Sequence, residues 1–133
     1  MPPPSFIDPR QALCADGDCN REHGMSEPIT RKILERFDVP DSKYETVIML
    51  VELAPQVNTG LHTHPGFDAA YLLDGHLTVL ERGQPDKRIG PGESWHVRPG
   101  VVHEVKVGDR TTKVLAMYVV EKGKPLATPW AAS

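Results

Sequence analysis

From residue 44 to the end of the chain, short β-prone segments alternate with glycine and proline turns, and this pattern restricts the fold more than any other feature. Residues 46–51 are β-branched or apolar on both faces, as expected of a covered strand. Similar segments occupy residues 69–73, 77–81 and 111–121, and no convincing helical crossover separates them. The pattern predicts an all-β fold, an antiparallel jelly-roll sandwich or barrel.

Two local patterns add detail to this prediction. Asp74-Gly75 lies between two β-prone segments, and glycine accepts the positive φ of a tight turn, so we expect a hairpin that pairs these segments. Near the start, Ile29, Ile33 and Phe37 are four residues apart, which also fits an amphipathic helix. Periodicity alone does not decide between a helix and a strand for residues 29–37.

The strongest chemical signal is His62-Thr63-His64. On an extended segment, side chains two residues apart point to the same face, so both imidazoles are available to one ligand. Asp68 and the distant His103 could complete a divalent-metal site, because imidazole nitrogens with a carboxylate oxygen suit iron, manganese, nickel, copper or zinc. A His-x-His pair alone is common, so the surrounding spacing carries the argument.

That spacing resembles the two sequence motifs of the cupin superfamily. The first motif runs from His62 through His64 and Asp68 to Gly75, and the second from Gly92 to His103, with ten residues between those two. The resemblance extends from about residue 31 to the C-terminus. It implies a cupin-like β-barrel over residues 28–133, a metal bound by His62, His64, Asp68 and His103, and a homodimer. It also favours a strand over a helix at residues 29–37, where small cupins are usually extended.

The resemblance is imperfect at several positions. Asp68 stands where the first motif usually has the longer Glu, Gln56 where a Gly is expected, and Val107 where an Asn is often found. In the second motif, the proline is displaced by one residue. Asp68 therefore either ligates the metal, reaches it through water or does not reach it, and both a three-histidine and a three-histidine–aspartate site remain open.

The resemblance implies a metal more firmly than it implies a reaction. Iron(II) in such a site would support dioxygenase-like oxidation of a small organic substrate, whereas manganese, nickel or zinc would support isomerase or lyase chemistry. The alternative is a non-enzymatic module that binds a metal or small molecule. His96 is a weak candidate for an acid/base group. Side chains alternate along a strand, so if the apolar Trp95 and Val97 point into the core, His96 between them faces outward.

Residues 1–27 read as a separate arm, flexible or lying on an interface, because they hold four of the 13 prolines and show no sustained apolar periodicity. Cys14, Cys19 and His23 are irregularly spaced and form weak evidence for zinc. A calcium-loop-like pattern from Asp16 to Glu27 has Arg21 where that loop requires glycine, so we regard it as chance.

Size and composition limit the number of domains and the kinds of binding partner that we expect. A chain of 133 residues with 39% hydrophobic and 25% charged residues fits one globular domain. A net charge of −3 offers no electrostatic reason to expect nucleic acid or anionic lipid as a partner, and no apolar run approaches a membrane span. The N-terminus lacks the basic and apolar regions of a signal peptide, so a cytoplasmic location is expected.

Overall fold

The structure, a computed structural model, describes residues 28–130, and these form strands, turns and loops without a helix. The predicted arm at residues 1–27 and its cysteine and acidic patterns lie outside the described residues. The ten strands are β1 (Ile29–Asp38), β2 (Tyr44–Leu53), β3 (His62–Thr63), β4 (Phe67–Asp74), β5 (Leu77–Glu81), β6 (Lys87–Ile89), β7 (Ser94–Val97), β8 (His103–Val107), β9 (Thr112–Glu121) and β10 (Thr128–Pro129).

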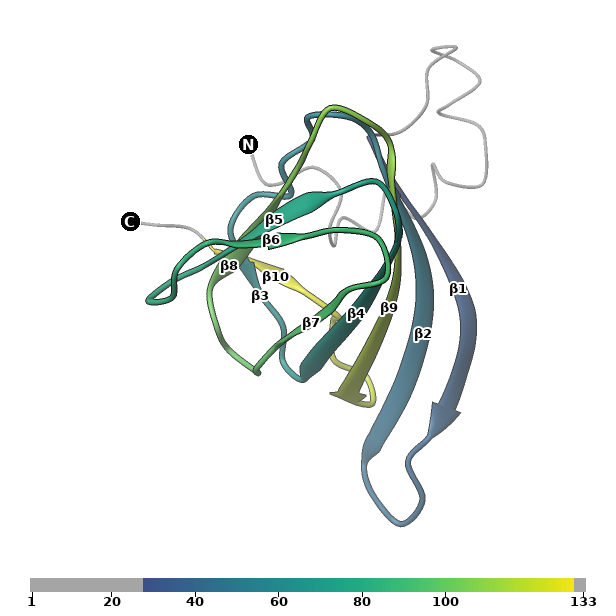
Figure 1. The fold of residues 1–133 in the computed structure, drawn as a ribbon. Coiled ribbons are helices and arrows are strands. Elements are labelled where there is room, and N and C mark those ends of the chain that lie inside the picture. The colour runs from purple at the N-terminus through teal and green to yellow at the C-terminus, as the bar shows by residue number, and fades with distance from the viewer. Residues whose placement is uncertain (1–27, 131–133) are drawn as a thin grey trace, which may run out of the picture.

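The strands build two five-stranded sheets that face one another (Figure 1). The first sheet has the order β1-β2-β9-β4-β7, the second has the order β10-β3-β8-β5-β6, and all pairings are antiparallel. This arrangement confirms the predicted all-β jelly-roll class. Over residues 28–130, no helix is long and apolar enough to cross a membrane.

Alternation of side chains directs one face of the first sheet into the space between the sheets. Along β9, residues 112, 114, 116, 118 and 120 are all buried, and their intervening neighbours are not. The pairing of Ala116 with Met49 on one side and with Ala70 on the other continues this buried face onto β2 and β4. The core therefore lies between the sheets, and the functional side chains described below are set into its walls.

Residues 29–38 form a strand, which confirms the extended alternative. Ile29 pairs with Leu53 and is 5% exposed, whereas Ile33 and Phe37 are each 46% exposed. The apolar residues spaced four apart therefore do not make one buried stripe. A break in the register between Ile33 and Glu35 changes the face to which later residues of β1 point.

The hairpin predicted at Asp74-Gly75 is wrong. Gly75 does adopt a positive φ of 91°, as a tight turn requires. However, β4 pairs with β7 and β9 in the first sheet, while β5 pairs with β6 and β8 in the second. The turn is therefore a corner at which the chain crosses from one sheet to the other. Strand β4 forms its hydrogen bonds with strands that are distant in the sequence and not with β5, which follows it.

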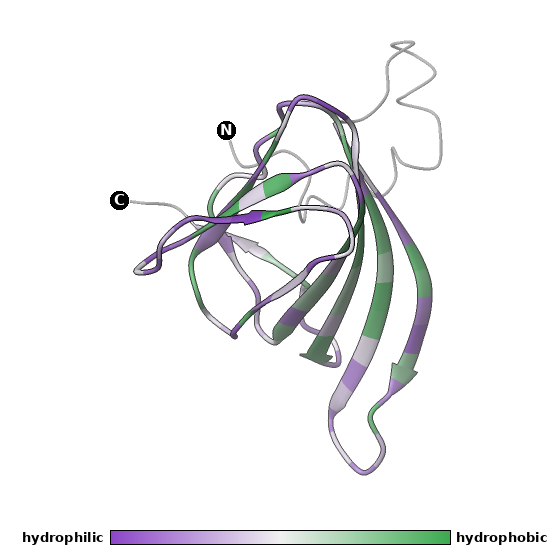
Figure 2. Ribbon diagram, in the orientation of Figure 1, coloured by the Kyte–Doolittle hydropathy of each residue, from purple (hydrophilic) through white to green (hydrophobic). Residues whose placement is uncertain are grey.

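The outer face of the first sheet is apolar over its centre. Ribbon colour in Figure 2 shows long hydrophobic stretches along β2, β9 and β4. Phe67, Tyr71 and Met117 are 51%, 44% and 42% exposed, and the register places Phe67 beside Val119 and Tyr71 beside Leu115. A contiguous exposed apolar face of this kind is more typical of an interaction surface than of a surface that contacts only water.

Candidate metal centre

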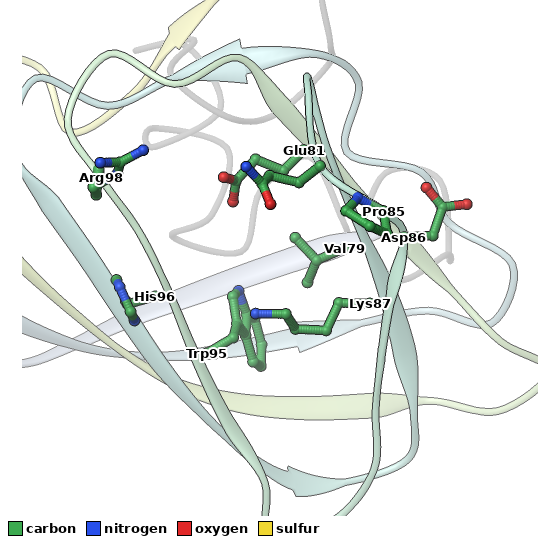
Figure 3. Close-up of a pocket in the computed structure, with 9 residues that line it drawn as sticks. Val79, Glu81, Pro85, Asp86, Lys87, Trp95, His96 and Arg98 are labelled. Atoms are coloured by element: carbon green, nitrogen blue, oxygen red, sulfur yellow. The ribbon is translucent and has the colours of Figure 1, made fainter.

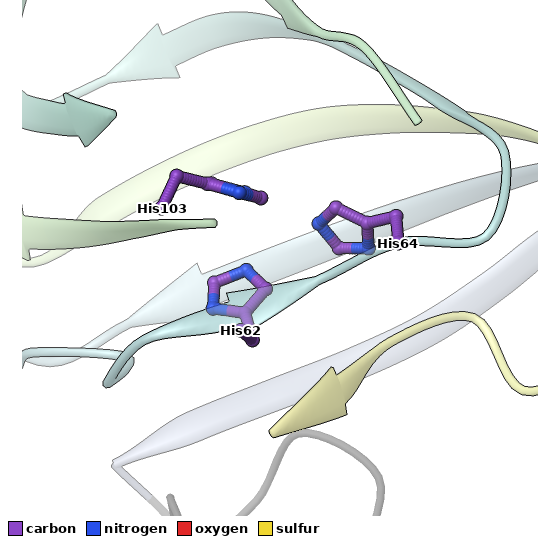
Figure 4. A group of neighbouring side chains, drawn as sticks. All are labelled: His62, His64 and His103. Carbon is purple, nitrogen blue, oxygen red and sulfur yellow. The ribbon is translucent and has the colours of Figure 1, made fainter. Parts of the chain in front are cut away.

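Three histidines meet between the sheets, on the wall formed by the second sheet. His62 of β3 lies directly opposite His103 of β8, and their ring centroids are 4.2 Å apart. His64 follows β3 and lies 4.9 Å from each of the other two rings. The three rings point toward a common space (Figure 4), and one ring nitrogen of each lies within 4.8 Å of the others. The three predicted histidines are therefore brought together.

Backbone carbonyls select the tautomer of each ring. Nδ1 of His62 lies 2.7 Å from the carbonyl oxygen of Gly60, Nδ1 of His64 lies 2.8 Å from that of Leu126, and Nδ1 of His103 lies 3.0 Å from that of Val101. A carbonyl oxygen can only accept, so each Nδ1 carries the proton and donates it. The lone pair of each neutral imidazole then resides on Nε2, which is the arrangement that a metal-binding histidine requires.

Burial keeps the imidazoles of His62 and His103 neutral. Each of the three histidines is 1% exposed. Desolvation, followed by the charges of His103 and His64, lowers the pKa of His62 to about 3, and desolvation also lowers the pKa of His103. Neutral imidazole is the form that binds a metal, so the protein presents these two ligands without competition from protons near neutral pH.

Asp68 approaches the cluster from the first sheet. It is 8% exposed, and its Oδ2 lies 3.1 Å from Nε2 of His64. Because Nδ1 of His64 already donates its proton to Leu126, this contact is favourable only if the imidazole takes a second proton or a cation lies beside both atoms. Two neighbouring ligands about 2.1 Å from an octahedral ion lie about 3 Å apart. The observed separation therefore fits a shared cation.

Tyr118 was missed by the sequence reasoning. It is 5% exposed, pairs with Asp68 across β9 and β4, and its ring lies 5.3 Å from that of His64. Desolvation, together with the carboxylate of Asp68, raises the pKa of its phenol. Alternation along residues 112–120 could have placed Tyr118 on the inner face. It could not have shown that β9 lies beside the strand that carries Asp68.

Arg31 is the second residue that the sequence did not single out. Its partner in β2, Val51, lines the cavity beside the histidines, so Arg31 occupies the same face of the sheet. Its positive charge lowers the pKa of both His62 and Tyr118, behind the larger effects of burial and nearer groups. A cation on this side disfavours further positive charge on the histidines.

The inner cavity, beside the histidines, has a volume of about 50 Å³. Five of its lining residues are polar or ionisable, namely Thr59, His62, Asp68, His103 and Tyr118. The other eight are hydrophobic and come from both sheets, and among them Trp95 carries one indole N–H donor. This volume is far below the ~300–1,000 Å³ of a typical small-molecule pocket. A ligand in the inner cavity is therefore small, or only one end of it enters.

An outer cavity of about 280 Å³ lies between β7 and the segment from β5 to β6. Figure 3 shows Lys87 extending toward Trp95 across this space, with His96 on the opposite side. His96 is exposed and does not join the three-histidine cluster. Trp95 lines both cavities and so forms the wall between them.

The fold, the three-histidine cluster and the sequence now agree. A family model described as a cupin domain matches residues 49–121, more than half of the chain. The chain belongs to the cupin family. Three histidines of this cupin could hold a metal ion, and their Nδ1 hydrogen bonds fit that role. No curated protein matches the chain.

Solved structures share the cupin fold at low identity. DMSP lyase DddQ from Ruegeria pomeroyi DSS-3 superimposes with a TM-score of 0.64 at 19% identity, over 77% of this chain and 51% of that one. Polyketide cyclase RemF from Streptomyces resistomycificus superimposes with a TM-score of 0.61 at 23% identity, over 79% of this chain and 74% of that one. A cupin-like protein from Thermotoga maritima superimposes with a TM-score of 0.61 at 22% identity, over 78% of this chain and 77% of that one. This cupin spans about half the length of DddQ.

The departures from the cupin motifs have visible structural counterparts. Gln56, which replaces an expected glycine, adopts a φ of 65° in the left-handed region that glycine favours. Val107, which replaces an Asn, is 5% exposed and belongs to the hydrophobic core. The shorter Asp68 still reaches His64. These three substitutions leave the histidine cluster intact.

Proposed function

We propose that this cupin is a metal-dependent enzyme whose divalent ion is held by His62, His64 and His103, with Asp68 as the fourth ligand. The observation that carries the proposal is the set of three buried histidines whose Nδ1 atoms all face backbone carbonyls, which leaves three Nε2 lone pairs for one ion. Nitrogen ligands with one carboxylate suit iron, manganese, nickel or zinc.

The reaction that we propose is dioxygenase-like oxidation of a small organic substrate. When bound, iron(II) would supply the electron transfer that such a reaction needs, and four protein ligands would leave two positions of an octahedral ion open. The inner cavity beside the histidines is small and mostly apolar, which suits dioxygen and the reactive end of a substrate. Asp68 and Tyr118 stand on the opposite wall, where they face whatever enters.

Lyase, cyclase or isomerase chemistry is the second candidate. Two proteins that share this fold are named as a DMSP lyase and a polyketide cyclase. A phenol and a carboxylate beside the cluster are groups that can hold or accept a proton in such reactions, and the ion would then act as a Lewis acid.

Elemental analysis of the purified protein tests the metal site directly. We expect near-stoichiometric metal in the wild type and none in the His62→Ala/His103→Ala variant. His96→Ala is the matched control, because His96 is exposed and outside the cluster, and it should retain the metal. Absence of metal from the wild type after reconstitution with iron, manganese, nickel and zinc would contradict the proposal and leave a non-enzymatic binding module.

The identity of the metal then separates the two reactions. Oxygen consumption by the iron-loaded protein with catechols, diketones or thiols would support oxidation. Product formation without oxygen, in the zinc-, nickel- or manganese-loaded protein, would support the lyase or isomerase alternative.

The proposal includes a homodimer. The exposed apolar centre of the first sheet, with Phe67, Tyr71 and Met117, supports it, because a two-fold interface places the same surface of both subunits in contact and an uncharged apolar face is complementary to itself. Such a dimer would leave the open seam between β6 and β7 and the outer cavity accessible to a substrate.

A further inference from the structure

We infer that Tyr118 donates a hydrogen bond from its phenol to an anionic or enolic oxygen of the molecule that binds beside the three histidines. Tyr118 would thus select small oxyanions, such as carboxylates and enolates, as substrates. The inference rests on the proposed metal site and names the chemical class that this site takes.

The topology places Tyr118 opposite the histidines. Strand β9 lies between β2 and β4 in the middle of the first sheet, and its even-numbered residues face inward. Tyr118 lines the inner cavity together with His62 and His103, and its ring lies 5.3 Å from that of His64. A ligand held by the histidines would therefore have the Tyr118 side chain as part of its opposite wall.

The Tyr118 hydroxyl has no hydrogen bond to any residue described in the structure. Asp68 is its neighbour across the strands, but the Asp68 carboxylate approaches His64 instead. A phenol is protonated at neutral pH, and a donor on a side chain that is only 5% exposed gains free energy when a ligand oxygen accepts its hydrogen. An oxygen atom of a bound ligand would provide that acceptor.

The other polar groups of the inner cavity are committed elsewhere. Thr59 donates from Oγ1 to the carbonyl of Gly60 and accepts from the amide of Val105. His62 and His103 donate from Nδ1 to carbonyls and present lone pairs on Nε2, and the Asp68 carboxylate is an acceptor. Among these polar side chains, Tyr118 is therefore the one with an uncommitted neutral donor; the hydrophobic Trp95 adds one indole N–H to the lining. A donor opposite a cation recognises a negatively charged oxygen that lies between them.

Formate is a suitable probe, because its three non-hydrogen atoms fit a cavity of about 50 Å³. In the cobalt(II)-loaded protein, formate binding would be followed by visible absorption. We expect Tyr118→Phe to raise the Kd for formate about tenfold while the affinity for cobalt stays unchanged. Tyr71→Phe is the matched control, because Tyr71 is 44% exposed on the outer face, and its Kd for formate should equal that of the wild type.

The outcomes separate this inference from the proposed function. A wild type that binds no cobalt overturns both. A wild type that binds cobalt but not formate, or a Tyr118→Phe variant that binds formate within twofold of the wild type, overturns the inference and leaves the metal site in place.

A second measurement keeps Tyr118 intact and does not depend on the folding of Tyr118→Phe. The Tyr44→Phe/Tyr71→Phe variant retains Tyr118 as its single tyrosine, because the chain has three tyrosines. When this variant is labelled with 3-fluorotyrosine and loaded with zinc, its ¹⁹F spectrum should show one signal. Formate should shift that signal if Tyr118 donates to it, and an unchanged signal at saturating formate overturns the inference.

Discussion

Oδ2 of Asp68 lies 3.1 Å from Nε2 of His64, although the two residues belong to opposite walls of the barrel. His64 follows β3 in the second sheet, and Asp68 is the second residue of β4 in the first. Only Pro65, Gly66 and Phe67 separate them, and a Cβ on Gly66 would collide with the backbone carbonyl of Val119. A tight crossing between the sheets therefore brings a carboxylate onto a histidine.

We expect Asp68→Asn to lower metal affinity by about 10- to 100-fold, since the amide lacks the charge that complements a cation near His64. Asp74→Asn is the control, because Asp74 lies on the same strand but is exposed and contacts Arg110. Titration of the metal-free proteins with zinc against a competing chelator measures both affinities. Equal affinities for the wild type and Asp68→Asn would remove Asp68 from the ligand set.

Metal-free protein should lose stability as the pH falls from 6.5 toward 3. Burial lowers the pKa of His62 to about 3, so in this range the unfolded chain binds a proton that the folded chain does not. From pH 7 to pH 5, His62 alone accounts for about 2 kcal/mol of lost unfolding free energy. His103, whose pKa is also lowered by burial, adds to the loss.

Urea unfolding at pH 7 and pH 5 measures this loss. His62→Ala should reduce the difference between the two pH values. His76→Ala should leave it unchanged, because the His76 side chain is 43% exposed and lies outside the cluster. An identical difference in the wild type and His62→Ala would show that another group causes the acid sensitivity.

The dimer prediction concerns the outer face of the first sheet. Met117, which is 42% exposed near the centre of this face, is a suitable position for a charge. Light scattering should give twice the chain mass of 14.7 kDa for the wild type and a single chain mass for Met117→Lys. Gln84→Lys, in the exposed turn between β5 and β6, should remain dimeric. A monomeric wild type would refute the dimer.

Local pattern and motif spacing were sufficient to predict much of this protein. The strands at residues 44–53 and 77–81 coincide with β-prone runs in the sequence. His62, His64 and His103 lie together, as the cupin-like spacing implied. These features depend on side-chain alternation and on turns that glycine and proline define within a few residues. The remaining features depend on which strands become neighbours, and that is decided by packing across the whole chain.

Tyr118 and Asp68 illustrate this limit. Alternation along β9 places Tyr118 inside, but its position beside Asp68 follows from β9 lying next to β4, far away in the sequence. Likewise, Asp74-Gly75 has the same local signal whether the chain folds back on itself or crosses to another sheet. The crossing occurs because β9 and β7 occupy both edges of β4, so no edge remains for β5.

Gly75 and Gly83 provide a matched test of that corner. Both have positive φ, 91° and 85°, so an alanine at either position carries a backbone cost of about 1–2 kcal/mol. At Gly75, a Cβ would also meet the carbonyl oxygen of Thr111 and the Cα of Thr112, each 2.7 Å away, whereas at Gly83 nothing lies within 4 Å. Gly75→Ala should therefore lower the free energy of unfolding by clearly more than Gly83→Ala, measured by urea unfolding at pH 7. Equal losses would mean that the corner can move away from β9 without cost, and the close approach of Gly75 to Thr112 would then not be what holds the crossing between the sheets.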